Sequence, residues 1–76
     1  MTKDLAYYLN LRYRVELIPD EDGWAAILPD LPGCVAAGDT AEEALALLED
    51  AKHGWFVSCL QHGDMIPEPQ TTTQLT

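Results

Sequence analysis

Four side chains in the sequence could bind a zinc ion, because structural zinc sites use four cysteine or histidine ligands, usually as two close pairs. They are Cys34, His53, Cys59 and His62. Cys59 and His62 lie three residues apart on a predicted helix, but Cys34 stands alone and His53 falls on another face of that helix. The spacing therefore predicts no metal site and no cofactor, with the cysteines as small core residues and the histidines in solvent.

Carboxylates could instead serve a metal-dependent nuclease, in which several of them hold two ions about 3.5–4 Å apart. The candidates are Glu16, Asp30 and Asp39. Each has a simpler structural role, on a strand surface, in a turn between prolines and before a helix. Nucleophilic catalysis has little support, because Ser58 is placed in mid-helix and nothing supplies an oxyanion hole. We therefore predict that the chain is not an enzyme, and keep the nuclease as a minor alternative.

Two segments could instead contact a partner protein. One is the motif PDLPGC at 29–34, which its prolines and glycine make a rigid turn, and whose Asp-Leu pair is expected to be exposed as a preorganised contact. The other is the acidic run at 20–22 with the tryptophan beyond it, where charge would speed encounter with a basic partner. The alternative for both is structural, as a turn and as solvated charge. The predicted partner-binding residues are Asp20, Glu21, Asp22, Trp24, Asp30 and Leu31.

The spacing of apolar residues indicates which elements position these segments. It predicts a short amphipathic helix at 3–11, and a half-buried strand at 13–18 that Pro19 ends because proline cannot donate to a ladder. The pair Asp22-Gly23 predicts a hairpin, because glycine accepts a positive φ. Two more short strands are predicted, at 24–28 and at 34–37.

The main helix is predicted at 40–62, with signals at both ends. Thr40 and Glu43 form a capping box at its start, and Gly63 ends it. The order predicts an α+β fold: a three-stranded antiparallel sheet with one long helix on one face plus a short N-terminal helix. The domain is expected at 1–69, followed by a polar, flexible tail at 70–76.

Length and charge limit the function further. The chain has 76 residues and a net charge of −9, from 4 Lys and Arg against 13 Asp and Glu. This balance argues against direct nucleic-acid binding by this chain and points to a basic partner. A chain this small is expected to gain burial by forming a homodimer or higher oligomer. No apolar run approaches the ~20 residues of a membrane helix, and no signal peptide is recognised, so a cytoplasmic location is expected.

Together these motifs resemble the HicB antitoxin family. The resemblance runs from about Tyr7 to Pro69 and rests on PDLPGC followed by GDTAEEALALLEDA, with the late IPEP, the early YYLNLRY and Trp24 after the hairpin glycine. It implies a partial RNase H-like fold. It also implies binding to a small basic toxin of the HicA type, which cleaves mRNA with a histidine and whose RNA-binding and catalytic surface the antitoxin covers.

The sequence also departs from the pattern of this family. Many HicB proteins carry a C-terminal DNA-binding module, whereas only seven residues follow Pro69 here and none is expected to form one. We therefore expect an antitoxin-like protein that neutralises a basic toxin. The alternative is an orphan homo-oligomer with a structural or regulatory role and no toxin.

Overall fold

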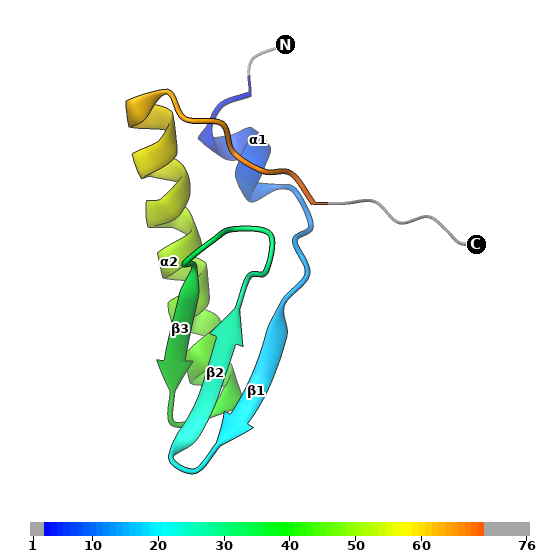
Figure 1. Cartoon of the computed structure of the whole chain (residues 1–76), viewed down its shortest axis with the longest axis vertical. Helices are drawn as coiled ribbons and strands as arrows, with labels where there is room; N and C mark the ends of the chain where they lie inside the picture. Colours follow the sequence, from blue (N-terminus) through cyan, green and yellow to red (C-terminus); the bar gives the residue numbers. More distant parts are fainter. Residues whose placement is uncertain (1–2, 70–76) are drawn as a thin grey trace, which may run out of the picture.

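The structure is a computed structural model that describes residues 3–69, so the predicted tail at 70–76 lies outside the described residues. A helix packs on one face of a small sheet (Figure 1). The strands run in the order β1-β2-β3 with both pairs antiparallel, which confirms the predicted α+β class. The elements are α1 (Leu5–Leu9), β1 (Glu16–Asp20), β2 (Gly23–Ile27), β3 (Val35–Gly38) and α2 (Ala41–His62).

Helix α2 begins and ends at the residues whose side chains and backbone favour those positions. Thr40 is its N-cap, with its hydroxyl accepting from the Glu43 N–H at 3.1 Å. The Glu43 carboxylate reaches back to accept from the Asp39 N–H at 2.6 Å, one residue earlier than in a standard capping box. Gly63 takes a left-handed conformation with φ 71°, which glycine adopts without a steric penalty.

The core lies between α2 and the strands β2 and β3, and extends to the short helix α1. Phe56 has no exposed surface, and its ring centroid lies 5.6 Å from that of Tyr8 and 5.7 Å from that of Tyr13. Lys52 is also buried, with its ammonium group 3.1 Å from a Glu49 carboxylate oxygen at the edge of the core. The fully or largely buried apolar residues are Tyr8, Ala26, Leu28, Leu31, Cys34, Ala44, Leu48, Phe56 and Ile66.

Strand β1 differs from the prediction in its position. It begins at Glu16 rather than Tyr13 and continues through Pro19, which pairs with Trp24. The prediction that Pro19 ends the strand is wrong because β1 is an edge strand. The neighbouring pair Asp20–Gly23 closes the two-residue hairpin, so Pro19 falls at a position where no N–H is needed toward β2.

Strand β1 is also not half-buried as predicted, since all five of its residues are exposed. Helix α2 packs on β2 and β3, and does not extend over β1. Leu17 shows the effect, because it pairs with the fully buried Ala26 yet stays 38% exposed on the helix side of the sheet. Helix α2 is therefore too narrow to cover all three strands.

The β1–β2 hairpin forms as predicted, but Gly23 is there for a different reason. It opens β2 without a positive φ; the described residues with positive φ are Gly33 and Gly63. A Cβ at Gly23 would collide with the backbone oxygen of Gly38 on β3. Glycine is therefore required by the close approach of two backbones.

The segment at 65–69 crosses α1 and closes the far end of the core (Figure 1). Ile66 is 7% exposed within the core cluster. The Tyr13 hydroxyl donates to the Pro67 carbonyl at 2.7 Å, and the Tyr7 hydroxyl donates to Glu68 at 3.1 Å. Lys3 pairs with the same Glu68 carboxylate at 2.9 Å. These contacts give the short helix α1 the docking partner that it needs to persist.

Alkaline pH is expected to weaken this closure. Burial raises the pKa of Tyr13 to about 12, and the nearby Glu68 carboxylate adds to the effect. The neutral phenol is thus favoured in the folded state, so its contribution to stability is complete below about pH 10 and is lost as the pH rises toward about 12. We expect the midpoint of urea unfolding to fall over this range, and to fall less steeply in Tyr13→Phe. Equal slopes for the two proteins would contradict the assignment.

Candidate partner-binding site

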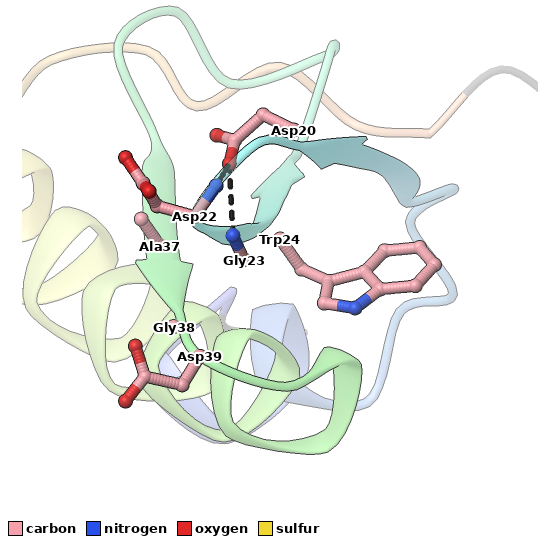
Figure 2. Close-up of a pocket in the computed structure, with 7 residues that line it drawn as sticks. All are labelled: Asp20, Asp22, Gly23, Trp24, Ala37, Gly38 and Asp39. Carbon is pink, nitrogen blue, oxygen red and sulfur yellow. Dashed lines mark hydrogen bonds between the residues drawn. The ribbon is translucent and has the colours of Figure 1, made fainter.

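Three aspartates lie around one depression at the hairpin end of the sheet. Asp20, Asp22 and Asp39 line an open depression of about 240 Å³, together with backbone and small side chains of β2 and β3 (Figure 2). We call these three aspartates the acidic corner. The structure thus brings together two of the predicted site residues from β1 and the turn, and adds a third from the connection between β3 and α2.

The backbone of the hairpin and of β3 positions the acidic corner. One Asp20 carboxylate oxygen accepts from the N–H groups of Asp22 and Gly23, both at 2.9 Å, which holds the turn closed (Figure 2). Asp39 is brought alongside because Gly38, the last residue of β3, pairs with Trp24 at the start of β2. The chain therefore delivers a carboxylate to each side of the same depression.

Within the part of the chain that the structure describes, no positively charged side chain forms an ion pair with the acidic corner. The ion pairs formed within residues 3–69 are Lys3 with Glu68 and Lys52 with Glu49, and neither reaches the hairpin. The corner therefore carries concentrated negative charge on a chain whose net charge is −9. Such a surface attracts a cationic partner over a distance of about one Debye length, roughly 8–10 Å in physiological salt.

Two other predicted residues lie beside the acidic corner. Glu21 is exposed in the hairpin turn and adds a fourth carboxylate outside the depression. Trp24 borders the depression, but its indole points away from the three carboxylates (Figure 2). The ring is half-buried and packs against the core on the helix side of the sheet. A direct contact of Glu21 or Trp24 with a partner stays a prediction.

The predicted exposure of Leu31 is wrong. Its side chain is 1% exposed and belongs to the core cluster. The PDLPGC turn folds inward because the Leu31 N–H donates to Leu28 and its carbonyl accepts from Cys34, both at 3.0 Å. The Trp55 indole also donates to the Pro32 carbonyl at 3.0 Å, which ties the turn to α2. For Leu31 the structural alternative therefore holds, and this side chain is a core residue.

Asp30 lies in the same turn and is half-buried. The turn follows the C-terminal end of β2, whereas the acidic corner lies at the N-terminal end of that strand. Asp30 therefore does not join the acidic corner, and a contact of this residue with a partner would need a second area of surface.

Asp39 is the residue of this corner that was not among the predicted partner-binding residues; from the sequence it was considered only as a candidate carboxylate of a nuclease. The order of elements indicates the position of Asp39, because a strand that runs antiparallel to β2 ends beside the residue where β2 begins. A carboxylate directly after β3 therefore returns to the hairpin.

The described part of the chain contains no cluster of three or more histidine, cysteine, aspartate or glutamate side chains arranged to hold a metal ion. Cys34 is a buried free thiol and Cys59 a half-buried one, and burial raises the pKa of both. A raised pKa leaves less of the reactive thiolate at neutral pH. Within residues 3–69, no helix combines the length and apolar character needed to span a membrane.

The order of three antiparallel strands and then one long helix defines a small α+β domain with one sheet face covered. A crystal structure from Thermus thermophilus has the same architecture, with a TM-score of 0.62 at 34% identity, covering 95% of this chain and 89% of that one. The family described as HicB_like antitoxin of bacterial toxin-antitoxin system matches residues 13–76. The chain belongs to this HicB-like antitoxin family.

Curated relatives include proteins named as antitoxins. Antitoxin HicB 2 of Photorhabdus laumondii is 44% identical over 62 residues, which are 82% of this chain and 45% of that protein. A UPF0150 protein of Thermoplasma acidophilum is 36% identical over 58 residues, which are 75% of this chain and 84% of that protein. The chain thus spans less than half the length of the HicB antitoxin that it matches.

Proposed function

We propose that the protein is an antitoxin that binds a small basic toxin of the HicA type and covers the surface with which that toxin binds and cleaves RNA. The observation that carries the proposal is the acidic corner, with three carboxylates that no cation of the described residues neutralises. Membership of the HicB-like antitoxin family supports the same partner class. The protein would act in the cytoplasm by occlusion, without catalysis of its own.

The physical basis is competition for one cationic surface. A toxin that binds RNA must present lysine and arginine side chains to phosphates. Carboxylates of the acidic corner can pair with the same side chains, so antitoxin and RNA exclude each other. The charges chiefly speed the encounter and orient the partner. The affinity depends more on the surface that is buried from water beside these charges.

Coexpression tests this function directly. The probe is the small basic protein encoded beside the gene of this chain, expressed alone and together with the antitoxin. We expect growth arrest by the probe alone, rescue by coexpression, and a stable complex on size-exclusion chromatography. Absence of both rescue and complex would refute the proposed function.

The role of the acidic corner has a test matched for charge. We expect Asp22→Asn with Asp39→Asn to slow association with the probe by about threefold or more at low salt, because steering depends on local charge. Asp50→Asn with Asp64→Asn removes the same two charges from exposed positions elsewhere and is expected to change the rate far less. Stopped-flow or biosensor kinetics at two salt concentrations measures both. Equal effects of the two double variants would show that only net charge matters.

Self-association is a separate part of the proposal. A chain of 76 residues gains burial from a second subunit, and we expect a homodimer or higher oligomer. Sedimentation equilibrium over a range of concentrations measures this, and a stable folded monomer of 8.4 kDa would contradict it.

A further inference from the structure

The face of the sheet opposite α2 is apolar. Successive residues of a strand point to opposite faces of the sheet. The buried Ala26 and the residues paired with it, Leu17 and Ala36, face the helix, so the residues next to them along each strand face the other way. Among these neighbours, Val35 is 56% exposed and Ile18 is 44% exposed. We call this surface the open face; its apolar residues are Ile18, Ala25, Ile27, Val35 and Ala37.

The open face runs directly into the acidic corner. Along β1 its residues alternate with carboxylates in the order Glu16, Ile18, Asp20, because all three share one side of the strand. Ala37 lies on the open face and also lines the depression between Asp20 and Asp39. The apolar surface therefore has negative charge along one side and at the hairpin end.

We propose that the open face and the acidic corner form one continuous docking surface for the basic toxin, an inference that rests on the proposed function. An apolar strip of the toxin would contact Ile18 and Val35. Lysine or arginine side chains beside that strip would reach the acidic corner. The short side chains of Ala25 and Ala37 add little bulk between these contacts, so the partner can approach the strands closely.

Charge favours the basic toxin over a second copy of this chain as the occupant. A second copy placed on the open face would bring its own carboxylates against Glu16 and the acidic corner. The chain has only 4 lysine and arginine residues against 13 acidic ones, and two of the four, Lys3 and Lys52, already pair with glutamates of their own chain. A protein rich in lysine and arginine relieves this repulsion and desolvates the apolar strip at the same time.

The test compares two substitutions at equal exposure. Ile18 on the open face and Leu47 on α2 are both 44% exposed. We expect Ile18→Lys to weaken binding of the basic probe protein by about tenfold or more, because it removes an apolar contact and adds a like charge. Leu47→Lys carries the same change of charge and is expected to stay within about twofold of the unchanged protein.

Further variants separate the alternatives. Val35→Lys should weaken binding as Ile18→Lys does. If Ile18→Lys does not fold, Ile18→Thr takes its place in the test, because threonine keeps a β-branched side chain. Full binding by Ile18→Lys and Val35→Lys would overturn the inference. So would loss of self-association with toxin binding intact, which would assign the open face to a second copy. Failure of the unchanged protein to bind the probe would instead refute the proposed function, and this inference with it.

Discussion

Phe56→Ala is expected to destabilise the protein by about 3–5 kcal/mol, which is the usual cost of removing a buried phenylalanine. Phe56 has no exposed surface, and its ring contacts Tyr8, Tyr13 and Trp55 at centroid distances of 5.6, 5.7 and 6.3 Å. The aromatic cluster joins α2 to α1 and to the chain before β1, so few neighbours can collapse into the cavity. For a domain of this size the total stability is roughly 4–11 kcal/mol, so the substitution is expected to remove a large share of it and to lower the unfolding midpoint strongly.

Urea unfolding followed by circular dichroism measures this loss. Leu47→Ala serves as the matched control, because it also truncates a large apolar side chain of α2 but at a position that is 44% exposed. We expect the control to lose less than about 1 kcal/mol. A loss below about 1 kcal/mol for Phe56→Ala would mean that the aromatic cluster is not the centre of the core.

Gly38→Ala is expected to destabilise the protein although alanine has the better intrinsic propensity for both strand and helix. A Cβ at Gly38 would lie 2.7 Å from the backbone nitrogen of Ala44 and 3.0 Å from the carbonyl carbon of Glu43. These atoms belong to the first turn of α2, so they cannot move without shifting the helix away from β3. We expect a loss of about 2 kcal/mol or more, within the usual range for overpacking.

Gly54→Ala is the control with the opposite expected sign. Apart from the surrounding backbone of α2 and the two neighbouring residues, a Cβ at Gly54 would meet no atom of the described residues within 4 Å. Alanine there should stabilise the protein by about 0.5–1 kcal/mol, because glycine in mid-helix loses more backbone entropy on folding. Thermal and urea unfolding of both variants tests the pair. If the two substitutions changed the unfolding midpoints by similar amounts in the same direction, the close packing of α2 on β3 would be contradicted.

The ends of helix α2 and the position of the first hairpin could be predicted from local sequence, whereas α1 is shorter, at Leu5–Leu9, than the predicted 3–11. Thr40 caps α2 and Gly63 ends it as its left-handed residue, because both signals act within a few residues of the chain. The hairpin after Asp20 and the order of the elements also follow from short-range patterns. The resemblance to HicB proteins depended on such local motifs, and it agrees with the family match over residues 13–76.

Burial and exposure depend on which surfaces pack together, so they could not be predicted from local sequence. Leu31 has the local sequence of an exposed turn, yet it is buried because α2 passes beneath that turn and Trp55 binds it. Pro19 remains inside β1 because that strand lies at the sheet edge, and β1 is exposed because α2 covers β2 and β3. Asp39 joins Asp20 through the pairing of β3 with β2.

The physical reason for this division is the range of the interactions. Caps, turns and alternation arise from contacts a few residues apart, so the order of amino acids specifies them directly. Burial, close approach of backbones and the clustering of like charges depend on contacts between distant segments, such as Trp24 with Gly38 or Tyr13 with Pro67. These features exist only once α2, the sheet and the segment at 65–69 have packed together.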